Sequence, residues 1–576
     1  MSFQALNVAA SSLRSQQKAM DVVSHNIANV NTPGYSKQTA NLATAIPERI
    51  GNIDFGRGVD LNSITRTVDP LINSAQQNNA SQFQFWDTVS TGLNSIENSF
   101  GSLDSTGLSA AVNDFFLSWQ QLSNNPQDTA QKYNVLSKTE SLTMQLNNMQ
   151  SQLSTGQQSL NLDINQQITD ANLKIDAISS LSQQISAMEA GQISGGANDL
   201  RDQRDQIVRD LAKIIPIQEV STKDGGLLIQ TAGGDLLVQD SMAKHLARGT
   251  GASVNGFQAI VISGTSNAVQ GLDQGGTIGG LLKLRDGNFG QYISSLDSFA
   301  ANLAFSTNQL HSSASGGTRT SLVQSGQGAI NPALALNDVT QGVAFAANVQ
   351  AGSFSMHVYD VLGVPQLPTS QFTVNLAAGA TMNDVANSIN ASVTGVTATV
   401  DAAGYLTIDA GTNTIAFGDD TSNFLAAYEI NTFFHGSDSG NLAINANLKA
   451  DASRIHTGRT DIVTSVVNSG DNSTAIAIMQ LQDQSMSVDG SVASTLHERV
   501  ATLSTQYGLD VSVAAQQRTY REAEATSLTQ QREAISGVNV DEELVSMMKF
   551  QRAYEAAAKV INTNNSMLDA LMGILR

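Results

Sequence analysis

Two stretches near opposite ends of this chain decide its fold. Residues 24–38 read SHNIANVNTPGYSKQ, and residues 537–554 read GVNVDEELVSMMKFQRAY. Each stretch adjoins a run in which apolar residues recur at alternating intervals of three and four. This spacing is typical of a coiled-coil seam, which is narrower than the apolar face of an ordinary surface helix. We therefore predict that the two ends form helices that pair with each other like the arms of a hairpin.

The predicted seam contains two polar residues, and further apolar residues lie beside it. Gln16 and Asn564 stand within its stripes, where polar residues weaken a helix pair but fix its register. Leu544, Met548 and Met572 flank the seam, and we expect neighbouring copies of the chain to bury them. Two amphipathic helices in one globular core are the alternative. The seam residues are Leu6, Leu13, Met20, Ile27, Met547, Phe550, Tyr554, Ile561, Leu568, Leu571 and Leu575.

The end of the first helix is marked by a turn signal. Pro33 and Gly34 suit the two central positions of a type II turn, in which glycine takes the positive φ angle. Asn29 or Asn31 is expected to satisfy the last carbonyl groups of the helix. As an isolated motif this is an ordinary helix stop, and its significance depends on the second stretch at the far end of the chain.

Composition narrows the class of protein. A chain of 576 residues exceeds one hydrophobic core and predicts three or four domains. The formal net charge of -20 argues against binding to nucleic acid or to anionic lipid. Cysteine is absent, which excludes disulfides and thiolate metal sites. No apolar run reaches the length of a membrane span, and the first residues lack the pattern of a cleavable signal.

The interior predicts a mainly α fold with β insertions. Helical spacing dominates most of it, whereas Gly-Gly pairs and alternating apolar residues indicate hairpins in two segments. The second of these segments resembles the small β modules of flagellins. The predicted domains are a terminal helical coiled coil (1–40 and 538–576), an elongated α-helical domain (41–215, 276–339 and 436–537), a β-rich insertion (216–275) and a second β-rich insertion (340–435).

No residue pattern predicts catalysis, a cofactor or a metal site. His497 and Glu498 begin like a zinc-protease helix, but Ala501 stands where the second histidine is required. Asp199, Asp202 and Asp205 alternate with arginines, and we interpret them as a solvated helical face, with a cation site as the alternative. No phosphate-binding loop and no Gly-x-Ser-x-Gly motif is present.

The two end stretches resemble the signatures of the flagellar rod, hook and hook-associated family of axial proteins. The first motif comprises Asn26, Ile27, Asn29, Asn31, Thr32, Pro33, Gly34 and Tyr35; the second comprises Gly537, Val538, Asp541, Glu542, Phe550, Gln551, Arg552 and Tyr554. Residues 198–205 resemble a further segment of that family, with Arg201 where an apolar residue is expected. Each motif is moderately specific, and the pair at opposite ends is strongly so.

The resemblance implies a structural subunit at the junction between hook and filament. Its implied partners are further copies in a ring, the hook protein, hook-associated protein 3 and a small export chaperone at the C-terminal helix. It also implies secretion through the flagellar export apparatus to a place outside the cell. A hook or distal rod protein shares the same ends and is the nearest alternative. An extracellular adhesin or hydrolase on a helical stalk, and a general coiled-coil scaffold, are more distant ones.

Overall fold

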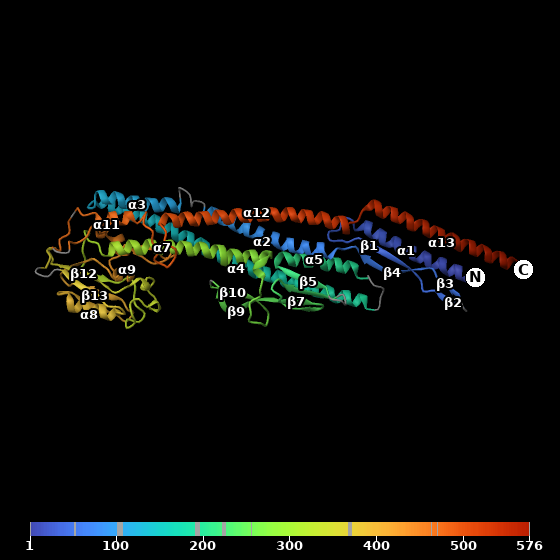
Figure 1. Cartoon of the computed structure of the whole chain (residues 1–576), viewed down its shortest axis with the longest axis horizontal. Coiled ribbons are helices and arrows are strands. Elements are labelled where there is room, and N and C mark those ends of the chain that lie inside the picture. Colours follow the sequence, from blue (N-terminus) through green and yellow to red (C-terminus); the bar gives the residue numbers. More distant parts are fainter. Residues whose placement is uncertain are drawn as a thin grey trace. The chain divides into compact units, whose positions relative to one another are not determined.

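The computed structural model describes residues 2–50, 53–100, 107–190, 196–221, 226–254, 256–366, 371–461, 464–468 and 470–574. The chain is mainly helical, with short strands in small sheets (Figure 1), as the sequence predicted. It divides into two compact units. The first, here called the terminal unit, comprises Met1–Gly92, Ser159–Asp286 and Ser512–Arg576. The second, the middle unit, comprises Leu93–Gln158 and Gly287–Val511.

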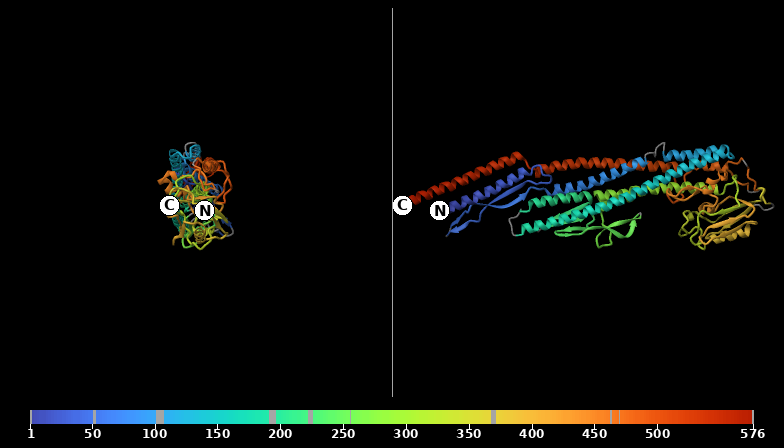
Figure 2. Two further views of the ribbon diagram at one scale, coloured as in Figure 1. Left: turned by 90° about the vertical axis from the view of Figure 1, so that its left-hand side faces the viewer. Right: turned by 180° about the vertical axis from the view of Figure 1, so that it is seen from behind.

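Helices from the two ends of the chain pair within the terminal unit. Helix α1 (Ser2–Ala28) lies along α13 (Val540–Ile574), and the two chain ends lie at the same end of the pair (Figures 1 and 2). The helices are therefore antiparallel. The predicted seam residues are half-buried between residues 6 and 568, apart from Tyr554 at 37% exposed. Leu575 and the side chain of Leu571 lie outside the described residues.

A β-hairpin covers a second face of α1, where the sequence predicted part of an α-helical domain. Strand β1 (Gln38–Thr44) pairs antiparallel with β4 (Val59–Arg66), and β2 (Glu48–Ile50) pairs with β3 (Ile53–Phe55). Small residues on α1 allow this approach: Ser15 Oγ donates to the carbonyl of Val59 at 2.8 Å, and Ala19 is fully buried. Helix α1 thus packs on two faces, whereas the seam accounts for only one.

The rest of the terminal unit joins the first β insertion to helices. Four strands form one antiparallel sheet and two form another, and their apolar residues share a core with α4 and α5. Asp69 caps α2 by accepting from the backbone N–H of Leu71 at 2.8 Å. The elements that lie wholly or partly in this unit are α2 (Pro70–Phe100), α4 (Thr129–Glu189), α5 (Asn198–Ile214), α6 (Gly276–Leu282), β5 (Ile217–Ser221), β6 (Leu227–Thr231), β7 (Leu236–Gln239), β8 (Met242–Ala243), β9 (Leu246–Val254), β10 (Phe257–Ile262) and α12 (Leu496–Ser536).

The middle unit combines helices with the second β insertion. Two three-stranded sheets and α8 enclose one apolar core, and Thr381 caps α8 in a capping box. Strand β11 joins one of these sheets from outside the predicted insertion, at residues assigned to the α-helical domain. The elements are α3 (Leu108–Asn124), α7 (Phe289–Ser312), β11 (Leu322–Gln324), β12 (Gly352–Tyr359), β13 (Gln371–Leu376), α8 (Met382–Ser392), β14 (Thr397–Val400), β15 (Leu406–Asp409), β16 (Thr414–Gly418), α9 (Phe424–Ala427), β17 (Phe434–His435), β18 (Ala443–Ile444), α10 (Ala446–Ala450) and α11 (Ser473–Gln480).

The last two features of the fold concern the polarity of its helices and a buried pair of histidines. Among the described residues, no helix is both long enough and apolar enough to cross a membrane. A pair of buried histidines, His311 and His456, lies in the middle unit with ring centroids 5.2 Å apart. Asn431 accepts from both rings, through its backbone carbonyl and its side chain respectively. The other ring nitrogens accept from the backbone N–H groups of His456 and Gly317, and burial lowers the pKa of both histidines, so both rings are neutral with fixed tautomers.

Candidate functional site

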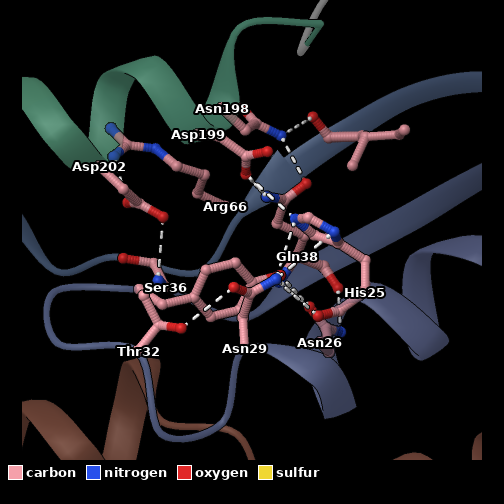
Figure 3. A network of polar contacts seen from close by, with 12 residues as sticks. His25, Asn26, Asn29, Thr32, Ser36, Gln38, Arg66, Asn198, Asp199 and Asp202 are labelled. Atoms are coloured by element: carbon pink, nitrogen blue, oxygen red, sulfur yellow. Dashed lines mark hydrogen bonds and ion pairs between the residues drawn. The ribbon is translucent and has the colours of Figure 1, made fainter.

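Asn26, near the end of α1, lies in a polar network with the following turn, β1 and α5 (Figure 3). It also contacts α13, so that the network joins both terminal motifs. Its amide nitrogen donates to the carbonyl of Gln38 at 2.9 Å and to Glu543 Oε2 at 3.0 Å. Its amide oxygen accepts from the Tyr35 hydroxyl at 2.7 Å and from the Gln38 N–H at 3.0 Å. An asparagine side chain can make four hydrogen bonds, and all four are made here. One buried side chain therefore links α1, the following turn, β1 and α13.

The turn after α1 has the geometry that its sequence predicted. The Tyr35 N–H donates to the Thr32 carbonyl at 3.2 Å, and Gly34 has a φ of 86°. Asn29 satisfies the carbonyl of His25 through its side chain at 3.0 Å, as one of the two candidates for that role. Burial, together with Asp199, Asp202 and Glu543, raises the pKa of Tyr35, so its hydroxyl remains a donor to Asn26.

Helix α5 meets the same turn through its acidic residues, which corrects the interpretation of a solvated face. Asp202 is only 7% exposed and accepts from the Ser36 N–H at 3.0 Å. Arg66 Nη1 bridges Asp202 Oδ1 at 2.7 Å and Asp205 Oδ2 at 2.9 Å. Asp202 and Asp205 thus point inward, where β4 supplies the arginine that the spacing on α5 alone could not reveal, whereas Asp199 is exposed as interpreted.

Asp199 and Asn198 extend this contact to β1 and β4. Gln38 Nε2 donates to Asp199 Oδ1 at 2.7 Å, and Asn198 Nδ2 donates to the Ile64 carbonyl at 3.0 Å. His25 Nε2 lies 3.3 Å from the same Asp199 oxygen (Figure 3). The segment 198–205, which resembles a family motif, therefore anchors the base of the terminal helix pair.

The start of α13 is fixed by charge. Lys37 Nζ lies 3.1 Å from both Glu542 Oε2 and Glu543 Oε1. Although burial opposes the charged ammonium, the two glutamates outweigh it and raise the pKa of Lys37. The Lys37 N–H also donates to the Ser536 carbonyl at 2.9 Å, and Arg532 Nη2 donates to the Tyr35 carbonyl at 3.0 Å.

The predicted motif residues divide into inward and outward groups. Asn26 and Tyr35 belong to the network, Glu542 pairs with Lys37, and Gly537 ends α12 with its N–H bonded to the Glu533 carbonyl at 2.9 Å. Ile27, Val538 and Phe550 are half-buried. The exposed members are Asn31, Thr32, Pro33, Asp541, Gln551, Arg552 and Tyr554.

Several residues of the network were not predicted from sequence. Gln38, Arg66 and Glu543 make central contacts. Gln38 and Arg66 carry no motif signal. Glu543 precedes Met547 by four residues, so it continues the seam by one position. A carboxylate in an apolar stripe requires a buried partner, and this signal identifies Glu543 in retrospect.

Other apolar residues of α13 face solvent beside the seam. Leu544, Val545 and Met548 are 45%, 61% and 52% exposed. Towards the C-terminus, Val560 and Met567 are 49% and 65% exposed. We call these residues, with Met572, the α13 flank. Large apolar side chains so exposed on a helix that already has one partner indicate contacts with further chains.

The described part of the chain offers no group of three or more His, Cys, Asp or Glu side chains that could hold a metal ion. The zinc-protease-like start at His497 has a structural role instead. Glu498 accepts from the Thr495 N–H at 2.8 Å while its own N–H donates to Thr495 Oγ1 at 3.1 Å, which is a capping box.

The polar network and the α13 flank define a structural protein whose two ends pair and present an apolar surface.

Comparisons with known proteins identify the family. Four family models match: "Flagella basal body rod protein" over residues 6–35, "Flagellar hook-associated protein FlgK helical domain" over 93–320, "Flagellin hook IN motif" over 359–412 and "Flagellar basal body rod FlgEFG protein C-terminal" over 529–574. The third match falls within the second β insertion, in agreement with its resemblance to flagellin modules.

Full-length relatives agree with these matches. The chain is 28% identical over 99% of both chains to flagellar hook-associated protein 1 of Salmonella typhimurium, and 28% identical over the same shares to that of Escherichia coli. The Bacillus subtilis protein of that name is 23% identical, over 99% of this chain and 98% of its own. The solved flagellar hook junction protein FlgK from Burkholderia pseudomallei is 18% identical, with a TM-score of 0.49, over 81% of this chain and 100% of that chain.

Over its full length the chain is similar to the hook-associated members of the flagellar rod, hook and hook-associated family of axial proteins. Its role is that of a structural protein of the bacterial flagellum. The resemblance seen in the two end motifs is thereby confirmed.

Proposed function

We propose that this chain is the subunit that joins the flagellar hook to the filament, arranged as a ring of copies held together by their terminal helices. The observation that carries the proposal is the α13 flank. Helix α1 covers one stripe of α13, and the flank lies outside that stripe with Met567 and Met572 at 65% and 68% exposed. Burying such a side chain is worth about 1.5–3 kcal/mol, so a neighbouring copy gains stability by covering the flank.

The polar network gives this assembly surface a fixed base. Asn26 and Glu543 join the ends of α1 and α13 that lie furthest from the chain termini, and α5 holds the turn beside them. A pair of helices anchored at one end keeps its direction while its exposed flank contacts other subunits. Preorganisation of this kind lowers the entropy that each new contact must overcome.

A junction subunit has a different neighbour on each side along the flagellar axis. The hook protein is the proposed partner on one side, and hook-associated protein 3 is the proposed partner on the other. The names of the full-length relatives and the rod-protein models at both ends support this placement. The chain would act outside the cell after passing through the flagellar export apparatus.

The same flank accounts for a proposed export chaperone. An exposed strip that includes Val545, Met548 and Val560 would invite premature self-association inside the cell. A small helical chaperone that covers the C-terminal helix until export would prevent this contact.

Electron microscopy of cells that lack this protein tests the proposal, combined with an assay for flagellin in the medium. Complete hooks without filaments, together with flagellin lost to the medium, are the expected result. Absent or shortened hooks would contradict it and would place the protein with the hook and distal rod subunits.

A further inference from the structure

A cavity of about 470 Å³ lies in the terminal unit between the turn after α1 and the helices α2, α5 and α12. Phe83 and Leu528 form an apolar part of its wall. Arg209, Lys213 and Arg532 form a cationic part of its wall. The polar network described above contributes only the turn residue Gly34 to this wall.

Two arginines in this cavity donate to no carboxylate among the described residues. Arg209 Nη2 donates to Gln206 Oε1 at 2.8 Å, and Arg532 Nη2 donates to the Tyr35 carbonyl at 3.0 Å. Both acceptors are neutral. Within the described ranges, neither guanidinium makes an ion pair, although each carries five N–H donors.

The aspartates whose charges act on Arg209 already have other cationic partners. Arg66 binds Asp202 and Asp205, and Lys213 binds Asp210 at 2.8 Å. Burial, and next the charge of Arg532, lower the pKa of Arg209. Lys213 is therefore paired, whereas Arg209 and Arg532 have no carboxylate partner within the described ranges.

The other side of the turn has the opposite charge. A second cavity, of about 460 Å³, is lined by Gly34 together with Asp199 and Asp202. The turn residue Gly34 thus lines both a cavity with two arginines and a cavity with two aspartates. Opposite charges on two sides of one element suit a head-to-tail contact, in which one copy presents the complement of the next.

We propose that the cationic cavity receives an acidic side chain from a neighbouring copy of this chain, whose carboxylate is bound by Arg209 and Arg532. The apolar wall would contact the methylene groups of that side chain. A second copy is the favoured source because the chain carries a net charge of -20 and therefore presents mostly acidic surface. The proposal depends on the ring of copies proposed above.

Site-specific cross-linking in assembled flagella tests this contact directly, because the chain has no native cysteine. Thr529→Cys places a thiol at the cavity, and Met567→Cys places one on the α13 flank as the matched control. Each is labelled with a benzophenone maleimide and irradiated. The expected product from residue 529 is a dimer of this chain, cross-linked to an acidic segment of the second copy.

The control separates the two proposals. Dimers from residue 567 without dimers from residue 529 would overturn the cavity proposal while leaving the ring intact. Absence of dimers from both positions would instead overturn the ring. A cross-link from residue 529 to a different protein would also overturn the cavity proposal.

Charge removal provides a second test. Arg209→Gln combined with Arg532→Gln should reduce the number of filaments per cell by about tenfold or more, because each lost charge pair weakens subunit contacts. Lys244→Gln combined with Arg248→Gln removes the same charge from exposed positions of the same unit and should leave the number unchanged. Equal filament numbers for the two double variants, with equal thermal stability, would overturn the proposal.

Discussion

Replacing Arg66 by methionine should destabilise the terminal unit strongly. The Arg66 side chain is 12% exposed, and those of Asp202 and Asp205 are 9% and 17% exposed. The substitution keeps an unbranched stem but leaves two nearly buried carboxylates without their cation. Breaking such a buried pair costs about 3–5 kcal/mol, mostly from the charge left behind. We expect about 3 kcal/mol because neither carboxylate is fully enclosed.

The loss should depend on pH in a defined direction. Burial already raises the pKa of Asp202, and without Arg66 the folded-state pKa of this carboxylate rises further above that of the unfolded chain. The folded variant then binds more protons than its unfolded state as the pH falls. Its stability deficit relative to the native chain should therefore shrink between about pH 7 and pH 4. Arg66 itself stays charged throughout, because Asp205 and Asp202 outweigh burial and raise its pKa.

Urea unfolding followed by tryptophan fluorescence measures this loss. The chain has two tryptophans, and Trp86 lies in the terminal unit while Trp119 lies in the middle unit. A Trp119→Phe background makes the signal specific to the terminal unit. Arg57→Met is the matched control, since Arg57 and Glu48 are exposed and 4.0 Å apart, and it should cost less than about 1 kcal/mol. Equal losses for Arg66→Met and Arg57→Met, or a deficit independent of pH, would refute the reasoning.

Three further predictions follow from single positions. Asn26→Asp places a carboxylate against Glu543 and should speed hydrogen exchange of the Lys37 amide more than Asn29→Asp does; equal rates would exclude Asn26 as the centre. Gly34→Ala should cost about 1–2 kcal/mol of unfolding free energy at its φ of 86°, whereas Gly56→Ala, with open space around it, should not; equal urea midpoints would contradict this. Burial lowers the pKa of His311 to about 4, so the unfolded chain binds protons first on acidification. The free energy of unfolding of the middle unit should therefore fall as the pH drops from about 6.5 to about 4. The fall should be smaller in His311→Gln, and thermal melting followed by Trp119 fluorescence measures it.

Much of the fold was predictable because its elements follow from local spacing. The heptad stripes predicted both terminal helices, which the structure contains as α1 and α13. Strands β1 and β4 were missed because they lie beside a helix rather than in a larger sheet, and their alternation is weak. The spacing of Ser11, Ser15 and Ala19 on α1 was their only signal, since small residues four apart allow a strand to approach closely.

The candidate site was predictable in part. The motifs identified Asn26 and Tyr35, whose contacts with each other are local in sequence. The ion pair between Arg66 and Asp202 joins residues far apart in the chain, and charge spacing within α5 pointed to solvent instead. Long-range polar pairs follow from tertiary packing, which no local pattern encodes. The seam and motif roles in assembly remain predictions.

The central claim is that the α13 flank makes the contacts between copies, and filament counts for flank variants test it most directly. Met548→Asp and Met567→Asp each place a charge on the flank, at side chains 52% and 65% exposed. Asn562→Asp adds the same charge at an exposed polar position of the same helix. The account predicts hooks without filaments for the first two variants, unchanged melting of the purified chain, and normal filaments for the third. Normal filament numbers with Met548→Asp and Met567→Asp would contradict it.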